Sequence, residues 1–280
     1  GAVNLILAGG SVNTLKSGKY CAGLQKDTTA EGTMLTIGGT GTLNATSGGF
    51  AAGIGGSNAK NGSYITISGG RITATGNGAG IGGGISASGN HIVISGGTVT
   101  TKGGYMAAGV GGGHGGDGRY ITISGGTVTA EGGYLSVGIG AGTDGVSSNI
   151  TISGGSVNAY CYSGKAIGAT PTNGTDTPVN VYKVVIPIAG DTTGGVDISS
   201  MTFTSGGNAY IYNMFGAKSI LDSGVGKVYV YLPGSSEGIA ATASYGGVTY
   251  SGGVTSSATT LTPPAPQAQW GVAGSGGAKP

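Results

Sequence analysis

One hexapeptide recurs at nearly constant spacing along the first part of the chain, and this repeat constrains the fold more than any other feature of the sequence. Copies of an Ile-x-Ile-Ser-Gly-Gly segment, two of them degenerate, begin at Leu5, Leu35, Ile65, Ile92, Ile121 and Ile150. Successive copies lie 27 to 30 residues apart. A period of this length is typical of solenoid proteins, in which each repeat is one supersecondary unit.

Two further apolar columns keep the same register. A short β-prone piece follows each glycine pair and is centred on Val12, Leu43, Ile72, Val99, Val128 and Val157. A third piece, rich in small residues, is centred on Leu24, Ile54, Ile81, Val110, Ile139 and Ile167. Each repeat is therefore expected to supply three short strands that are separated by glycine turns.

These columns predict an all-β fold with almost no α-helix: a right-handed parallel β-helix of about six turns, each of about 29 residues, over residues 1–170. In Ile65-Thr66-Ile67 the period of two places both isoleucines on one face. No single repeat can bury that face, whereas repeats stacked about 4.8 Å apart close a common core. Glycine makes up 66 of the 280 residues, and its periodic placement argues against disorder.

The combination of an Ile-Thr-Ile-Ser-Gly-Gly strand, a Val-Thr-Ala-type strand and a Gly-Ala-Gly-Ile-Gly-Gly-Gly strand resembles the glycine-rich repeats of secreted bacterial cell-surface proteins. That resemblance covers roughly residues 1–170. It implies the right-handed parallel, pectate-lyase-like β-helix architecture. Several proteins of this kind are carbohydrate-binding or adhesin-like, so the resemblance also implies a secreted or cell-surface location.

The period disappears after Pro171, and a Thr, Asn, Gly and Pro cluster there indicates a boundary. Residues 178–261 are expected to form a small all-β module, or a cap that shields the last open turn of the solenoid. The strands expected there are Val179–Ile188, Met201–Thr204, Ala209–Tyr212, Lys227–Leu232 and Ala240–Tyr245. Residues 262–280 resemble a disordered linker or tail.

Charge and hydropathy exclude two classes of partner. The net charge is +2 from 12 basic and 10 acidic residues, and no basic block offers the clustered cations that nucleic acid requires. No apolar run approaches the roughly 18 to 20 residues of a membrane span, so no membrane insertion is expected.

The chain opens without methionine at Gly1, which suggests a fragment or mature form. We expect a monomer.

Acidic residues are scarce in the repeats, which disfavours an enzyme. Asp117 and Asp144 occupy the same inter-strand loop of successive turns, so their carboxylates are expected to lie close together in space. Together with carbonyl groups of the glycine loops, they are candidate ligands for calcium. The alternative is two solvated loop acids. No other cofactor is expected, since neither His91 nor His114 has a second histidine or a cysteine at ligand spacing. Paired catalytic carboxylates are not evident.

Aromatic residues also recur with the period. One set lies four or five residues before the third apolar column and comprises Tyr20, Phe50, Tyr105, Tyr134 and Tyr162. A second set immediately precedes the first strand and comprises Tyr64, His91 and Tyr120. Stacked turns would make each set a ladder. The ladders either bind sugar rings, with Tyr105, Tyr134, Tyr64 and Tyr120 as the ligand-binding residues, or stack on one another as part of the packing.

Cys21 belongs to the first turn and Cys161 to the sixth, so about five steps of 4.8 Å separate them. A disulfide requires Cα atoms within about 7 Å, so both thiols are expected to remain reduced. Each is expected to be a small buried residue, with exposure as the alternative for Cys161, which lies between Tyr160 and Tyr162.

The sequence thus predicts a non-catalytic secreted or cell-surface β-helix with a carbohydrate-binding or adhesin-like role, whose partner would be a polysaccharide or cell-surface glycan. The alternatives are a structural spacer that displays other domains and, more remotely, a polysaccharide lyase-like enzyme.

Overall fold

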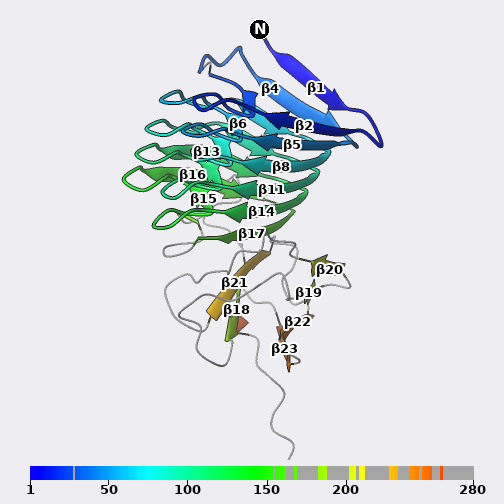
Figure 1. Ribbon diagram of the computed structural model, residues 1–280. Coiled ribbons are helices and arrows are strands. Elements are labelled where there is room, and N and C mark those ends of the chain that lie inside the picture. The colour runs from blue at the N-terminus through cyan, green and yellow to red at the C-terminus, as the bar shows by residue number, and fades with distance from the viewer. Residues whose placement is uncertain are drawn as a thin grey trace, which may run out of the picture.

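The protein is a parallel β-solenoid with a period of about 29 residues, followed by further strands (Figure 1). The computed structural model describes residues 1–27, 29–153, 155–161 and 167–168, together with strand segments at 182–187, 202–205, 208–211, 227–232, 240–245, 248–253 and 259–260. The described residues contain no helix. The all-β, parallel β-helix prediction is therefore confirmed.

Three parallel sheets run along the stack, and each turn adds one strand to each sheet. Sheet A comprises β1 (Val3–Leu7), β4 (Leu35–Gly39), β7 (Ile65–Ile67), β10 (Ile92–Ile94), β13 (Gly118–Ile123) and β16 (Ser147–Ile152). Sheet B begins with β2 (Val12–Lys16), β5 (Thr42–Thr46), β8 (Arg71–Thr75), β11 (Thr98–Lys102), β14 (Thr127–Glu131) and β17 (Ser156–Tyr160). Sheet C comprises β3 (Leu24–Gln25), β6 (Ile54–Gly55), β9 (Ile81–Gly82), β12 (Val110–Gly111) and β15 (Ile139–Gly140), and a parallel bridge joins Ile139 to Ile167.

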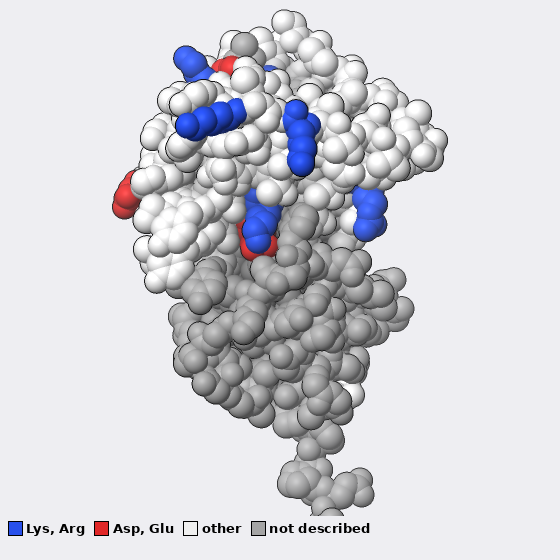
Figure 2. Space-filling model, in the orientation of Figure 1, with Lys and Arg blue, Asp and Glu red and all other residues white. Residues whose placement is uncertain are grey.

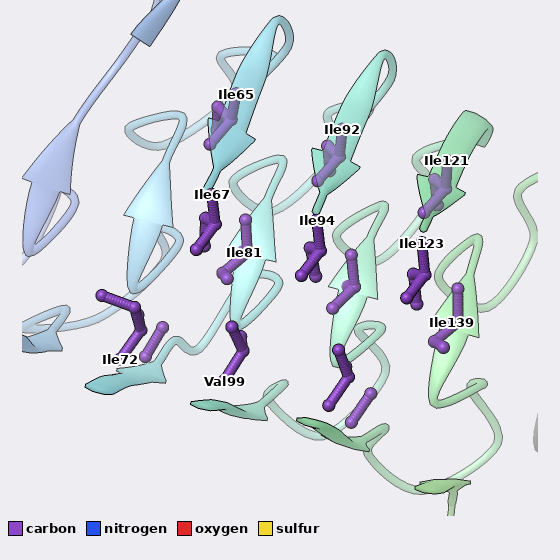
Figure 3. Packing of buried hydrophobic residues seen from close by; sticks show 14 of the residues in the cluster. Ile65, Ile67, Ile72, Ile81, Ile92, Ile94, Val99, Ile121, Ile123 and Ile139 are labelled. Atoms are coloured by element: carbon purple, nitrogen blue, oxygen red, sulfur yellow. The ribbon is translucent and has the colours of Figure 1, made fainter. Parts of the chain in front are cut away.

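The core consists of aliphatic columns inside this stack, one or two from each sheet. Ile67, Ile94, Ile123 and Ile152 occupy one register position of sheet A and are all buried, as predicted. Figure 3 shows the isoleucines of β7, β10 and β13 repeating from turn to turn. The predicted columns of sheets B and C are likewise buried from Leu43 and Ile54 onward.

The first turn departs from the predicted register. Leu5 pairs with Ile37, whereas the sequence pattern aligned it with Leu35, and Val3 is the residue beside Leu35. In sheet B, Val12 pairs with Thr42 and is 70% exposed, while Asn13 lies beside Leu43. The placement of Val12 in the buried column is wrong. A strand has a period of two, so a shift of one residue turns an inward side chain outward.

The C-terminal strands belong to two sheets. In sheet B, β21 (Lys227–Leu232) pairs with β17 at Val157 and Tyr231, and β18 (Tyr182–Pro187) and β24 (Thr259–Thr260) follow it. A separate antiparallel sheet has the order β20 (Asn208–Ile211), β19 (Thr202–Ser205), β22 (Ala240–Tyr245) and β23 (Val248–Gly253). Two of the predicted strands, Lys227–Leu232 and Ala240–Tyr245, match in both bounds.

Other C-terminal predictions differ from the structure or lie beyond it. Strands β19 and β20 are each displaced by one residue from the predicted segments, and β23 was not predicted. Strand β18 is described only from Tyr182 to Pro187, within the predicted Val179–Ile188. The choice between a module and a cap for residues 178–261 stays a prediction. The predicted tail at 262–280 lies outside the described residues.

Cys21 and Cys161 form no disulfide with each other, as the stacking distance requires. Cys161 is buried, but Cys21 is exposed, which corrects the expectation that both are buried. Cys21 lies in the loop that leads to β3, where its amide donates to the carbonyl of Gly18 at 3.1 Å.

Candidate functional site

Each turn of the solenoid has three corners, and the surface features of the protein lie at these corners. A glycine corner joins sheet A to sheet B, a longer loop joins B to C, and a second loop leads from C to the next strand of A. The two aromatic sets lie at the second and third corners, respectively. Corner side chains are not needed to fill the core, so they are the positions at which a ligand site can form.

The aromatic residues of the B-to-C loops form two separate pairs. Tyr20 stacks on Phe50 with 5.8 Å between ring centroids, and Tyr105 stacks on Tyr134 at 5.4 Å, each pair with 15° between the ring planes. The amino group of Lys19 lies 5.4 Å from both the Tyr20 and the Phe50 ring centroids. Tyr162 lies outside the described residues. The expectation of one continuous ladder is therefore wrong for this set.

The interruption has a structural cause in the third turn. The loop between β8 and β9 covers residues 76–80 and is two residues shorter than the corresponding loops at 47–53 and 103–109. It carries no aromatic residue, and Asn77 at its tip is exposed. The sequence already indicates this shorter loop, because the repeat from Ile65 to Ile92, which contains Asn77, is 27 residues long, whereas the other repeats are 29 or 30 residues long.

Tyr105 borders this gap. The amide of Gly104 donates to the carbonyl of Gly78 at 3.0 Å, which places the Tyr105 loop directly against the shortened loop. One face of the Tyr105 ring is covered by Tyr134, and no aromatic ring of the described residues stacks on the other. Tyr105 is 67% exposed, the largest exposed fraction among the aromatic residues of the described solenoid. The site thus combines the unstacked face of the Tyr105 ring with the exposed side chain of Asn77 in the adjoining loop.

The second aromatic set forms the predicted ladder at the C-to-A corner. The His91 ring lies 4.6 Å from that of Tyr64 and 4.7 Å from that of Tyr120, with interplanar angles of 6° and 15°. All three residues have left-handed backbone conformations, with φ between 55° and 59°. They precede paired residues of β7, β10 and β13, so the spacing of the rings follows the spacing of the strands.

Stacking limits what this ladder can bind. Both faces of the His91 ring are covered by its neighbours, and Tyr64 and Tyr120 each have one face against it. Only the outer faces of Tyr64 and Tyr120 are not stacked within this ladder, and Tyr120 is 51% exposed, against 67% for Tyr105. A sugar packs on an aromatic ring through the ring face, so Tyr105 is the better platform of the proposed ligand-binding residues.

The two aspartates proposed as calcium ligands have different partners. Asp117 accepts a hydrogen bond from the amide of Val146 at 2.8 Å, and its other carboxylate oxygen lies 2.9 Å from Nη2 of Arg119. Asp144 is largely exposed and lies 3.6 Å from Nε2 of His114. The register pairs the Asp117 loop position with Val146 and not with Asp144. Calcium binding by these two residues stays a prediction.

Two further acids of the repeats, Asp27 and Glu131, also have partners of their own. Asp27 accepts hydrogen bonds from the amide and hydroxyl of Ser57 at 2.7 and 3.0 Å. Glu131 is buried and forms an ion pair of 2.6 Å with Lys102 on the neighbouring strand. Burial lowers the pKa of Lys26, and the adjacent Asp27 opposes this shift. Within the described residues no three His, Cys, Asp or Glu side chains gather as a metal site.

Comparison with known families agrees with this geometry. The Beta helix repeat family model matches residues 35–58, 65–85, 92–114, 121–143 and 150–169, and each match begins at the first residue of an Ile-x-Ile-type segment or its Leu35 variant. This chain is a β-helix repeat protein. Neither a curated protein nor a solved structure matched it. In the part of the chain that the structure describes, no helix has the length and apolar character to cross a membrane.

Proposed function

We propose that this β-helix is a non-catalytic carbohydrate-binding or adhesin-like protein that is secreted or held at the cell surface. The observation that supports this function best is the open face of Tyr105 beside the shortened third loop. Together with Tyr134 it forms an exposed aromatic patch, and contiguous apolar patches mark binding sites more often than single exposed residues do. The sequence resemblance to bacterial surface repeats supports the proposed location.

The chemistry of this position suits a sugar ring. The C–H-rich face of a pyranose packs on an aromatic ring, while its hydroxyl groups remain available for hydrogen bonds. Asn77 is exposed in the loop that backbone hydrogen bonds hold to the Tyr105 loop, and its side-chain amide offers both a donor and an acceptor. Stacking on Tyr134 restrains the Tyr105 ring, so little side-chain freedom would be lost on binding.

The non-catalytic part of the proposal is supported by the acids of the repeats. Glycoside hydrolysis uses two carboxyl groups that face one scissile bond. Here Asp117 is paired with Arg119, Asp144 lies beside His114, and Glu131 is paired with Lys102, so each carboxylate has a different partner. A reducing-sugar assay on every polysaccharide that binds tests this part directly, and release of reducing ends would contradict it.

A polysaccharide array probed with the chain of residues 1–280 tests the binding function. We expect Tyr105→Ala to lose most of the binding and Tyr105→Phe to keep it, because stacking needs the ring and not the hydroxyl group. The melting temperature of both variants should stay within about 1 °C of the parent, since the ring lies outside the core. Absence of binding to any polysaccharide would contradict the proposal and favour the structural spacer.

A further inference from the structure

The glycine corner between sheets A and B forms a shallow, open groove of about 370 Å3 across three turns. Its lining consists of Gly39, Thr40, Gly69, Gly70, Arg71, Gly97 and Thr98. The glycines are required by the stack: a Cβ on Gly97 would lie 2.6 Å from the carbonyl oxygen of Gly70. The same requirement keeps the corner free of side chains and leaves the backbone accessible.

Arg71 is the exception in an otherwise small, uncharged column. The register of sheet B aligns Thr42, Arg71, Thr98, Thr127 and Ser156 at the first position of successive strands. Arg71 is exposed, and among the described residues its guanidinium forms no ion pair. No acidic residue lines the groove. Stacking does not require a charged residue at this position, because threonine occupies it in the turns on both sides.

The backbone of the groove offers further donors. The amides of Arg71 and Thr98 are occupied, since they donate to the carbonyls of Gly41 and Gly70 at 2.9 Å. The amides of Gly69, Gly70 and Gly97 donate to no acceptor within the described residues. Gly70 and Gly97 have φ values of 86° and 83°. Successive free N–H groups around a left-handed residue form a concave site that favours an anion.

Basic side chains are more prominent than acidic ones on one face of the solenoid. Figure 2 shows Lys and Arg spread over the visible face of the solenoid, with few Asp or Glu among them. An anion that reaches this groove would meet one guanidinium, which can bind an oxyanion through two parallel hydrogen bonds, together with backbone donors and the hydroxyl groups of Thr40 and Thr98.

From these features we infer that the groove at Arg71 binds the carboxylate or sulfate groups of an acidic polysaccharide. This site lies at a different corner from Tyr105 and does not depend on the function proposed for that residue. A polymer is favoured over a single small anion because the groove continues across three turns and is open to solvent. Nucleic acid is disfavoured, since one arginine cannot replace the clustered cations that a phosphate backbone requires.

The test measures binding of the chain of residues 1–280 to dextran sulfate, to alginate and to neutral dextran, at about 50 and 150 mM salt. We expect binding to one or both acidic polymers and none to neutral dextran; the preferred acidic polymer identifies the anionic group. Arg71→Thr should weaken this binding about tenfold or more, as expected for the loss of a charged hydrogen-bond donor. Threonine is native at the matched positions of the adjacent turns, so the variant should fold.

Lys60→Thr is the matched control, because it removes the same charge from an exposed position outside the groove. It should keep binding within about twofold, so that a loss in Arg71→Thr alone assigns the binding to the groove. Three outcomes would overturn the inference: no binding to either acidic polymer, equal binding by Arg71→Thr and the parent, or an equal loss in Lys60→Thr. Single-stranded DNA that binds as tightly as dextran sulfate, and loses affinity equally in Arg71→Thr, would assign the groove to a different ligand.

Discussion

The first turn and the central turns of the solenoid have similar strand sequences but differ in burial. In the central turns Ile67, Ile94 and Ile123 are completely buried. In the first turn Val3, at the register position of Leu35, is 58% exposed and Leu5 is only partly buried, although Leu7 is buried. Strands β1, β2 and β3 are each at the end of their parallel sheet, with a paired neighbour on one side only.

This difference shows that stacking provides the burial, whereas the strand sequence only provides the apolar side chain. An isoleucine between two turns loses its contact with water on both sides, while a side chain of the first turn is covered from one side. Repeat proteins are stabilised by such nearest-neighbour contacts. The same substitution should therefore have an effect that depends on the position of its turn in the stack, and four predictions test this.

The largest loss of stability is expected in the middle of the stack. Ile123→Ala should lower the free energy of unfolding by about 2 to 5 kcal/mol, because the two adjacent turns are fixed and the cavity cannot collapse. Thr122→Ala, on the outward face of the same strand, should cost less than about 1 kcal/mol. Denaturant melts of both variants measure the difference, and comparable losses would contradict the assigned faces.

A slightly smaller loss is expected when a side chain is forced between two turns. Gly111 has a φ of 131°, and a Cβ there would collide with the carbonyl group of Gly140 on the next turn. Gly111→Ala should therefore cost about 1 to 3 kcal/mol. Gly18→Ala is the control, since a Cβ at Gly18 has no atom within 4 Å. Thermal unfolding should show a clear shift for the first variant and almost none for the second.

The predictable part of the fold is the part in which each turn has two neighbours. From Leu35 to Ile152 the apolar columns, the parallel pairing and the glycine corners all follow from one repeated pattern. At the first turn the pattern is weaker, and hydrophobicity alone placed Val12 inward. The hairpin of β22 and β23 was missed although Gly246-Gly247 separates Tyr245 from Val248, a two-residue spacing that is typical of a tight turn.

The candidate sites were less predictable because they depend on departures from the repeat. Periodic spacing predicted the ladder of Tyr64, His91 and Tyr120, but spacing alone did not show that stacking covers the ring faces. The open face of Tyr105 results from a missing pair of residues in a neighbouring turn. The role proposed for Arg71 could not be predicted from the sequence, since the groove and the amides without an acceptor appear only once the corners are stacked.

The end of the stack should respond less than the middle to loss of an aliphatic side chain. Leu5 is partly buried and pairs with Ile37, which is fully buried one turn further in. Leu5→Ala should cost about 1 kcal/mol, whereas Ile37→Ala should cost about 2 to 5 kcal/mol. Equal losses in denaturant melts would show that the first turn is covered as completely as the second.

The smallest effect on stability is expected at the exposed cysteine of the first turn. Native protein treated with Ellman's reagent should release one equivalent, from exposed Cys21, while buried Cys161 should react only in denaturant and bring the total to two. Alkylation of Cys21 in the native state should change the free energy of unfolding by less than about 0.5 kcal/mol, because its side chain is exposed. Two equivalents from native protein would contradict the burial of Cys161. No equivalents even in denaturant would mean that the two cysteines are linked, although about five steps of the stack, roughly 24 Å, lie between them.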